Sequence, residues 1–495
     1  MTALFVVNDP QDWPLQVPGA TIVPARRYLT DAAYQSTANG APTQVFNLCK
    51  FQRYQGVGYY VSLLAEARGH QPVPKVKTIR DLQSENITRI LTEELDEIVQ
   101  QELAGIPGPV YEVDIYFGHD SQRRHEQLGQ QLFRLMQTPL LRARFEKQGE
   151  RWRVHGLQAI QAKDVQASRF DVISAAAAEY IGDHERRRRR RAGAQPSLAI
   201  LCSPDEAEPP SNPEAIRHFH EAAADAGLRS EIITFRDLRR IGEFDALFIR
   251  NTTAVNHYTY RFSRRATAEG LVVIDDPDSI LRCSNKVYLA ELLARHRIPA
   301  PKTMIVHRDN VAEVVPQLGL PCVLKKPDSA FSLGVVKVDT EPELAAKVDE
   351  FLEKSELIIA QESLMTEFDW RVGVLDRRPL FACKYMMAPG HWQVIKRQGE
   401  RKTHEGETVA LGLAQAPDYV VETAVKAANL VGDGLYGVDL KEVGGKAYVI
   451  EINDNPNIDA GNEDAIVGDA LYGALMSVFA QRIEAMRTQP KDATR

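Results

Sequence analysis

The sequence predicts a multidomain protein of mixed α/β and α+β class. Three observations support this: the chain length, an alternation of strand and helix signals in the middle, and an acidic hairpin signal near the end. At 495 residues the chain is too long for one compact core, and a prior of about 150 residues per domain suggests three units. Its hydrophobic content of 44% and charged content of 26% are ordinary for a globular protein.

Residues 1–165 are predicted to form a first α/β domain. A strand is expected near 4–7, a helix from Gly58 to Gly69, and another strand at 113–117 that leads into a long helical pattern. Two segments are candidates for more than a connecting role. Cys49 to Tyr54 comes just before the predicted helix, and Tyr116 to Asp120 lies at the end of the predicted strand. They either bind a ligand or partner, or serve as turns and domain-interface residues, and the second role is the commoner one.

Residues 166–195 are predicted to be a linker. An alanine-rich, helical stretch leads to six consecutive arginines, Arg186 to Arg191. Six like charges cannot pack into a core, so the run marks an exposed connector. A nucleic-acid arm is the alternative, but no aromatic residues interleave with the arginines. The net charge of -7 also argues against general nucleic-acid affinity.

Residues 196–283 alternate strand and helix signals at the spacing of βαβ units. Strands are expected at 198–202, 232–235, 246–249 and 271–274, and Pro213 begins a helix. This order predicts a small, mostly parallel sheet. Such sheets bind ligands beyond the carboxyl ends of their strands, where Arg250 lies.

The pattern changes in residues 284–362, the next predicted subdomain. A helix is expected over 287–296, followed by two strands joined by the polar loop 326–334. Lys325 stands at the entry of this loop and Ser332 lies within it. Backbone N–H groups of such a loop can fold over phosphates while the lysine neutralises them, although a plain turn has the same composition. The strand 357–362 ends in polar residues that could present backbone groups to a base.

The last predicted subdomain, residues 363–485, contains a hairpin over 437–457. Gly444 and Gly445 permit the positive φ angles of a tight turn between two strand-like runs. Residues two apart in a strand share a face, so Glu451 and Asn453 point together and Asp439 on the partner strand can lie beside them. Three hard oxygen ligands on one surface suit magnesium. The basic segment 386–408 lacks periodicity and is either a surface loop or a flap over an anion.

Composition also sets bounds on the compartment. The five cysteines are scattered without a CxxC pair, which argues against a zinc site or a disulfide framework. The N-terminus has no basic region before its short apolar run, and no window approaches the roughly 18 apolar residues of a membrane helix. We therefore expect a soluble, cytoplasmic protein without a membrane partner.

Four segments together resemble the ATP-grasp carboxylate-amine ligases, in particular the RimK and glutathione-synthetase-like branch. They are SNKVYLAELLARHRIPAPKT (284–303), PCVLKKPDSAFSLGVV (321–336), AQESLMTEFDWRVGVL (360–375) and YGVDLKEVGGKAYVIEINDNPN (436–457). The segments GYYVSLLAEARGH (58–70) and YFGH (116–119) similarly resemble the extra N-terminal domain that a subset of these ligases carries.

This resemblance implies ATP bound between two α+β subdomains, with Mg²⁺ as the metal and Mn²⁺ as its substitute. The implied phosphate contacts are Lys286, Lys325 and Ser332, and the implied base and nucleotide contacts are Glu362, Ser363, Leu364 and Asp369. Asp439, Glu451 and Asn453 match the metal ligands. Arg371 and Lys384 fall near the transferred phosphate, and Arg250 is expected to help steady the charge that develops in the reaction.

Two departures from the family pattern stand out. The phosphate loop is normally rich in glycine, but here only Gly334 remains, so we expect the mobility or closure of this loop to differ from the family pattern. The stretch 392–406 lacks the Arg-x-Asn and Arg-Gly-Gly elements of the RimK type. The identity of the acceptor is therefore open.

The expected activity is an ATP-dependent ligation through an acyl-phosphate, in which a carboxylate from an amino acid or short peptide is joined to an amine. Two alternatives remain: a ligase that adds amino acids to a protein terminus, and a non-catalytic regulator that binds ATP. The sequence leaves the substrate pair, the role of the N-terminal domain and the existence of a homo-oligomer open.

Overall fold

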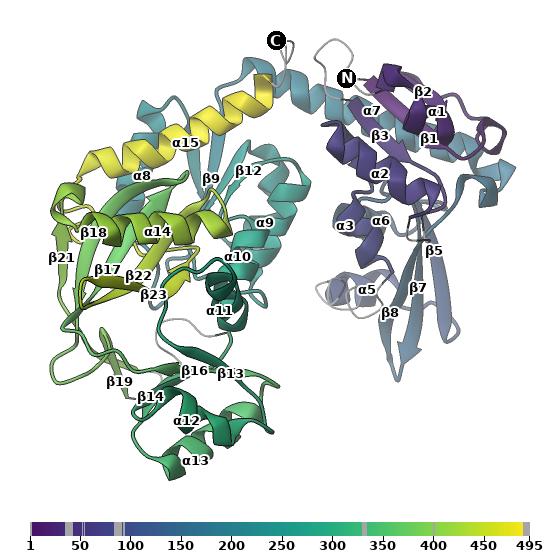
Figure 1. Ribbon diagram of the computed structural model, residues 1–495. Helices are drawn as coiled ribbons and strands as arrows, with labels where there is room; N and C mark the ends of the chain where they lie inside the picture. The colour runs from purple at the N-terminus through teal and green to yellow at the C-terminus, as the bar shows by residue number, and fades with distance from the viewer. Residues whose placement is uncertain are drawn as a thin grey trace. The chain divides into compact units, whose positions relative to one another are not determined.

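A computed structural model gives the fold of the chain (Figure 1). The structure describes all residues except 1, 35–42, 52, 54, 84–91, 93–94, 329–333, 399–400 and 489–495. The chain divides into two compact units, one of residues 1–194 with 485–495 and one of residues 195–484. No helix among the described residues is long and apolar enough to cross a membrane.

The first unit contains a four-stranded parallel sheet in the order β2-β1-β3-β4. Apolar side chains cover both faces of its central strands, with Val6 and Val45 on one face and Phe5 and Phe46 on the other. This burial on both faces is typical of parallel sheets. The elements are β1 (Thr2–Val7), β2 (Ala20–Pro24), α1 (Ala25–Thr30), β3 (Thr43–Asn47), α2 (Val57–Ala67), β4 (Gln71–Val73) and α3 (Val76–Asp81).

A second, antiparallel sheet follows in the same unit, in the order β6-β5-β7-β8. The predicted strand at 113–117 is part of it, whereas the long β7–β8 hairpin was not predicted. Alternating exposed arginines along β7 and β8 weaken the apolar signal there. The elements are α5 (Asp96–Glu102), β5 (Val110–Tyr116), β6 (His119–Asp120), α6 (Glu126–Met136), β7 (Leu140–Gln148) and β8 (Arg151–Ala159).

The predicted linker contains helix α7 (Phe170–Gly193), whose backbone continues through the arginine run. Its first half is buried on one face, where Ile173, Ala177 and Ile181 pack into the core of the first unit. Arginine is a good helix former, so a run of arginines does not by itself end a helix.

The second unit opens with the expected parallel sheet, in the order β10-β9-β11-β12. One strand was misplaced: β10 covers 229–233 and not 232–235, because Thr234 caps the 3₁₀ turn that starts at Phe235. The elements are β9 (Ser197–Leu201), α8 (Pro213–Asp225), β10 (Arg229–Ile233), β11 (Ala246–Ile249), α9 (Tyr258–Ala268), β12 (Val272–Ile274) and α10 (Pro277–Ser284).

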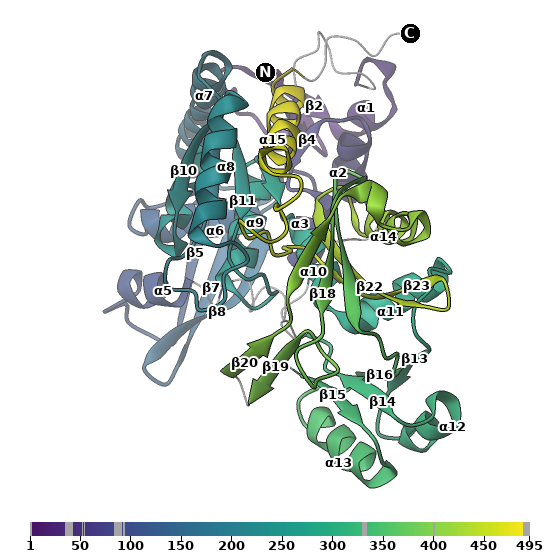
Figure 2. The same cartoon turned by 90° about the vertical axis from the view of Figure 1, so that its left-hand side faces the viewer.

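A small antiparallel sheet, in the order β13-β16-β14-β15, comes next. Figures 1 and 2 show α12 and α13 on the face of this sheet that points away from the larger sheet described below. The elements are α11 (Lys286–Arg295), β13 (Thr303–Val306), α12 (Val314–Leu318), β14 (Cys322–Lys325), β15 (Val335–Val338), α13 (Glu341–Leu352) and β16 (Ile358–Glu362).

The larger sheet is antiparallel, with the order β21-β18-β17-β22-β23, and helix α14 covers one of its faces (Figure 1). The segment 386–408, which was expected to be an irregular loop, contains a short hairpin of β19 and β20. Its two strands form four antiparallel residue pairs, from Ile395 with Glu405 to Gln398 with Arg401. The elements are β17 (Phe368–Leu375), β18 (Arg378–Met386), β19 (Ile395–Gln398), β20 (Arg401–Glu405), β21 (Thr408–Leu411), α14 (Asp418–Val431), β22 (Leu435–Val443), β23 (Lys446–Asn453) and α15 (Asp469–Thr488).

The predicted hairpin at the end of the chain is confirmed as β22 and β23. Gly444 and Gly445 form its turn with φ angles of 60° and 72°, which residues with a Cβ atom rarely adopt. A bulge after Asp439 shifts the register, so that Asp439 lies opposite Glu451 while Leu440 lies opposite Val449. The bulge keeps both carboxylates on one face of the sheet.

Candidate functional site

One face of the larger sheet carries a row of charged side chains. Arg371 on β17 pairs in register with Asp439 on β22, which in turn pairs with Glu451 on β23. Residues at paired positions project from the same face of a sheet. Apolar residues of the opposite face pack against α14, so the row of Arg371, Asp439 and Glu451 lies on the face away from that helix.

Arg371 and Asp439 form a two-pronged ion pair. The guanidinium donates from Nε to Asp439 Oδ1 over 2.5 Å and from Nη2 to Oδ2 over 2.8 Å. Asn453 donates its amide Nδ2 to the same Oδ2 at 3.2 Å. Because the nitrogen of this amide is used as the donor, its oxygen remains an acceptor. The structure therefore brings Asp439 and Asn453 together as the sequence predicted.

The guanidinium of Arg371 has one further hydrogen-bond partner, Tyr385. Its Nη1 donates to the hydroxyl of Tyr385 over 3.3 Å, and that hydroxyl donates to Glu463 over 2.6 Å. Gly437 leaves room for the side chain, since a Cβ atom there would lie 3.1 Å from Arg371 Cδ and 2.6 Å from the Cβ of Pro456. Arg371 is thus fixed in one orientation on the charged face.

Lys286 and Glu451 form a second ion pair, with 2.7 Å between Nζ and Oε1. Lys286 begins α11, whose N-cap is Asn285, and its backbone N–H donates to Pro327 O at 3.0 Å. Burial would raise the pKa of the Glu451 carboxyl, but Lys286 and then Lys325 hold that pKa below its ordinary value. Glu451 is therefore a carboxylate in the neutral pH range.

Lys325 lies at the end of β14, with 8% of its surface exposed. Burial lowers the pKa of its ammonium to about 8, against the opposing influence of Glu451. Within the described part of the chain, no carboxylate lies at ion-pair distance from Lys325. A buried ammonium without a partner is costly, so an anion that reaches it would be bound strongly.

Asp369 extends the charged row on β17. It accepts hydrogen bonds from Lys441 Nζ at 2.6 Å and from the hydroxyl of Thr366 at 3.3 Å. Burial raises the pKa of Asp369, and Lys441 opposes that rise. The acid is thus tied to Lys441, a lysine that the sequence analysis did not single out because it lies inside an ordinary strand pattern.

The predicted adenine-side residues lie at the end of β16. Glu362 accepts from the backbone N–H of Lys302 at 2.7 Å, and its own N–H donates to Lys302 O at 2.9 Å. Ser363 and Leu364 follow it in extended chain and are partly exposed. Ser332 and the rest of 329–333 lie outside the described residues.

Arg250 follows β11 and is completely buried. Its guanidinium donates to the Ser211 hydroxyl, to Asn455 Oδ1 at 2.6 Å, and to the carbonyls of Pro210 and Pro456. Burial lowers its pKa to about 10. These contacts tie the parallel sheet to the segment after β23, and the expected role of Arg250 in steadying the charge of the reaction stays a prediction.

Lys384 is separated from the charged row. It lies opposite Trp370 in the register of β17 and β18, and its Nζ lies 4.2 Å from the ring centroid of Phe368 and 5.0 Å from that of Trp370. Trp370 belongs to the core beneath α14. The structure therefore places Lys384 on the other face of the sheet from Arg371, whereas the sequence analysis expected both residues near the transferred phosphate.

Two buried acids were not predicted. Asp275 follows β12, and Asp454 follows β23. Burial raises the pKa of Asp454 to about 6, and burial with the nearby Asp454 raises that of Asp275 well above its ordinary value. Neither oxygen of the Asp275 carboxyl meets a hydrogen-bond partner among the described residues. Their position directly after strands was the only signal available in the sequence.

The donor set of the charged face suits a hard divalent cation. Asp439 and Glu451 supply carboxylate oxygens, and Asn453 supplies an amide oxygen, which are the ligand types that Mg²⁺ prefers. No cluster of three or more histidine, cysteine or acidic residues suited to a metal occurs in the described ranges. The two acids and the amide on this face therefore remain the candidate metal ligands.

Comparison with known families matches two parts of the chain. Residues 25–176 match the family described as the RimK-like ATPgrasp N-terminal domain, and residues 283–468 match the RimK-like ATP-grasp domain. The second match contains both ion pairs of the charged face. The first lies wholly within the first compact unit.

Among similar proteins, a probable alpha-L-glutamate ligase from Pseudoalteromonas atlantica is 27% identical over 252 residues, which are 50% of this chain and 78% of that protein. A probable alpha-L-glutamate ligase from Alcanivorax borkumensis is 25% identical, over 50% of this chain and 80% of that protein. Among solved structures, a RimK domain ATP-grasp protein from Sphaerobacter thermophilus aligns with a TM-score of 0.43 and 17% identity, over 58% of this chain and 98% of that one.

Proposed function

We propose, from the premise that this chain is a RimK-like ATP-grasp protein, that it is an ADP-forming ligase that joins a carboxylate to an amine. The observation that carries the proposal is the convergence of Lys286, Lys325 and Arg371 with Asp439 and Glu451 on one surface. Cations that bind phosphate and acids that bind a metal are both needed for phosphoryl transfer. A carboxylate needs such activation because it is a poor electrophile.

In this proposal the lysines bind the phosphates of ATP. Lys325 has no carboxylate partner among the described residues and is buried, so its ammonium is available to a phosphate. Lys286 exchanges its contact with Glu451 for a phosphate oxygen when the nucleotide binds. Glu362, Ser363 and Leu364 hold the base, and Asp369 with its partner Lys441 lies at the nucleotide.

Asp439, Glu451 and Asn453 are the proposed Mg²⁺ ligands. When bound, the ion would screen the negative charge of the phosphates during transfer. Arg371 fixes Asp439 through two hydrogen bonds, so the carboxylate is held in place before any ligand arrives. This preorganisation is what a site for phosphoryl transfer requires.

The reaction has two steps. An oxygen of the substrate carboxylate attacks the γ-phosphorus of ATP, and the bond from that phosphorus to ADP breaks. The amine nitrogen then attacks the carbonyl carbon of the acyl-phosphate, phosphate leaves, and the amine gives up one proton. Arg371 supplies a fixed positive charge on the face where these anions form.

The similar proteins named probable alpha-L-glutamate ligase make L-glutamate the first amino acid to test as a substrate. The amine could belong to a second amino acid, a peptide or a protein terminus. A screen of ADP release over amino acids and dipeptides, with mass detection of the products, identifies the pair. Masses added to protein termini in cell extract would identify a protein acceptor.

The decisive test traps the activated carboxylate with hydroxylamine. The protein, ATP, Mg²⁺ and the correct acid should form ADP and a hydroxamate in equal amounts. Glu451→Gln should abolish both products, while Glu350→Gln, an exposed carboxylate paired with Lys347 on α13, should leave them unchanged. Full activity in Glu451→Gln would overturn the site. Tight ATP binding without turnover over the whole panel would instead favour the regulator.

A further inference from the structure

A pocket of about 230 Å³ lies in the first unit, at the carboxyl edge of its parallel sheet. The strand order is β2-β1-β3-β4. The chain leaves β1 toward β2 on one side and leaves β3 toward β4 on the other, so the two loops diverge. Open parallel sheets bind ligands in the crevice at such a switch point.

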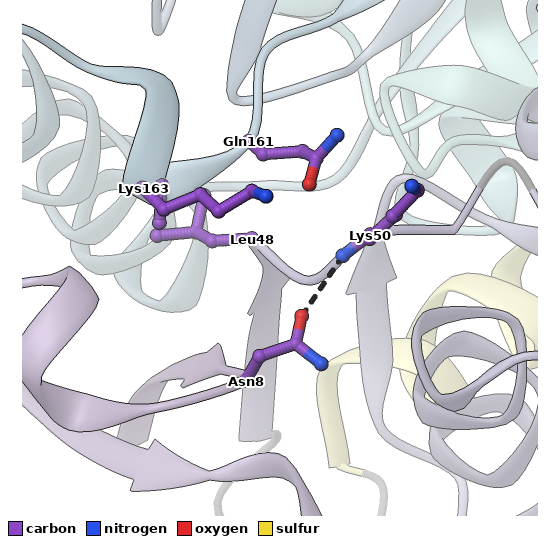
Figure 3. A pocket seen from close by; sticks show the side chains of 6 residues that line it. Asn8, Leu48, Lys50, Gln161 and Lys163 are labelled. Atoms are coloured by element: carbon purple, nitrogen blue, oxygen red, sulfur yellow. Dashed lines mark hydrogen bonds between the residues drawn. The ribbon is translucent and has the colours of Figure 1, made fainter.

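Six described residues line the pocket, and three separate segments supply them (Figure 3). One segment follows β1, one follows β3, and one follows β8 at a 3₁₀ turn (Ala162–Asp164). The lining residues are Asn8, Leu48, Lys50, Gln161, Ala162 and Lys163. Every one of them belongs to the first unit, whereas the charged face described above belongs to the second.

One polar side chain of the pocket, Asn8, is held by a hydrogen bond, and two apolar residues lie beneath the polar ones. Asn8 accepts the backbone N–H of Lys50 with Oδ1 at 3.0 Å, so the NH₂ end of its amide remains a donor. Leu48 and Ala162, which are 3% and 4% exposed, form an apolar base. Figure 3 shows the side chain of Lys163 beside Leu48, with Gln161, Lys50 and Asn8 around the rest of the pocket.

Hydrogen bonds of the Asn47 side chain hold the loop after β3 in place. Asn47 donates Nδ2 to Gly58 O at 2.7 Å and to Ser62 Oγ at 2.9 Å, and its Oδ1 accepts the N–H of Cys49 at 3.1 Å. Burial raises the pKa of the Cys49 thiol to about 12, so this cysteine is a packing residue and not a nucleophile. The loop that carries Lys50 is therefore anchored to helix α2 through Asn47.

The charge of the pocket is positive. None of the six lining residues is acidic, and within the described ranges no carboxylate lies at ion-pair distance from Lys50 or Lys163. Ammonium groups act as point charges for phosphate and carboxylate oxygens. The volume lies below the roughly 300–1,000 Å³ of pockets for drug-sized ligands, which restricts the occupant to a small molecule.

We propose that this pocket binds a small oxyanion, a phosphate or the carboxylate of a molecule of amino-acid size, between Lys50 and Lys163. Asn8 contributes its amide NH₂ and Gln161 its side-chain amide. The site is separate from the ligase reaction in its residues, and it gives the N-terminal domain a ligand of its own. It also gives a role to Lys50 in the segment from Cys49 to Tyr54, which the sequence left open between ligand binding and a plain turn; Gln52 and Tyr54 lie outside the described residues.

Calorimetric titration of the full-length protein with inorganic phosphate, succinate and L-glutamate, each to millimolar concentration, tests the proposal. At least one probe should bind, and Lys50→Gln and Lys163→Gln should each weaken it about ten-fold, the loss expected for one charge-assisted hydrogen bond. Lys75→Gln, an exposed lysine of the same unit outside the pocket, is the matched control and should leave binding unchanged. Phosphate as the only ligand identifies a phosphate site, and binding of succinate or glutamate identifies a carboxylate site.

The ATP site also attracts anions, so a second variant separates the two sites. Binding that persists in Lys325→Met but is lost in the Lys50→Gln and Lys163→Gln double variant supports the pocket. Binding that is lost in Lys325→Met and unaffected by the double variant overturns the proposal, as does failure of all three probes to bind. Equal thermal unfolding of the variants and the wild-type protein confirms that a loss of binding is not a loss of folding.

Discussion

Lys286 at the start of α11 lies 2.7 Å from Glu451 on β23, so one ion pair joins the helix that begins the nucleotide-binding subdomains to the strand that supplies the proposed metal ligands. The two residues are separated by most of the ATP-grasp match in sequence. The contact holds the proposed metal ligand Glu451 in its charged form and marks the place where phosphates are expected.

Removing one partner of this pair should destabilise the protein. Lys286→Met leaves Glu451 without its nearest cation, and we expect the free energy of unfolding to fall by about 1–3 kcal/mol, the cost of an unsatisfied buried group. Adding Glu451→Gln to Lys286→Met should restore part of the loss. Urea unfolding of the four proteins of this cycle measures the coupling. Lys347→Met, which breaks an exposed pair with Glu350, should change the stability by less than about 1 kcal/mol.

The two-pronged contact between Arg371 and Asp439 should be needed for turnover. Lysine keeps the positive charge but loses the planar pair of donors, so Arg371→Lys should lower kcat by at least about ten-fold. Steady-state ADP release at saturating substrate measures this effect. Arg217→Lys, whose partner Glu221 is exposed on α8, is the control. Unchanged kcat in Arg371→Lys would mean that the charge alone matters.

The lowered pKa of Lys325 predicts how ATP binding depends on pH. The ammonium of the ligand-free protein, with a pKa of about 8, is charged below that pH and neutral above it. Phosphate favours the charged form, so ATP should bind with full affinity below pH 8, bind more weakly as the pH rises through 8, and take up a proton near that pH. Calorimetry in two buffers of different ionisation enthalpy detects the proton. The uptake should vanish in Lys325→Arg.

Lys384 should be dispensable for the reaction. Its ammonium lies against Phe368 and Trp370 on the α14 side of the sheet, so Lys384→Met should keep kcat while lowering stability by about 0.5–2 kcal/mol, the range for a cation over an aromatic ring. Kinetics and thermal unfolding of the same sample separate the two effects. A large loss of kcat at unchanged stability would contradict this prediction and would mean that Lys384 takes part in the reaction.

Replacing Arg250 should mainly lower the stability of the protein. Arg250→Met leaves the Pro210 and Pro456 carbonyls and the Asn455 amide without their donor, and we expect a loss of roughly 3 kcal/mol or more in unfolding free energy. Denaturant unfolding measures it. If the variant keeps wild-type stability but loses kcat, then Arg250 acts on the substrate directly.

Local patterns predicted much of the architecture. The glycine pair at 444–445 and the strand runs around it placed the β22–β23 hairpin, and alternation of strand and helix placed the parallel sheet of 196–283. The β7–β8 and β19–β20 hairpins were missed because charged residues interrupt the alternation there. The predicted boundary of β10 was wrong because Thr234 is the N-cap of the 3₁₀ turn that starts at Phe235. The strand-like composition of this run does not show that its end forms a cap.

The sequence by itself named the candidates for the chemistry of this site. Residue type and spacing along strands grouped Asp439, Glu451 and Asn453, and the resemblance to the ATP-grasp ligases added two lysines and an arginine. Only the tertiary structure decided which of them meet. Lys384 and Arg371 lie on neighbouring strands, β18 and β17, but on opposite faces of the sheet. The register of the two antiparallel strands sets the face of each side chain. The hydrogen-bond donors of Arg250 are occupied by groups such as Asn455 and Pro456. These residues lie about 200 positions away in the sequence, so only the folded chain shows the contacts.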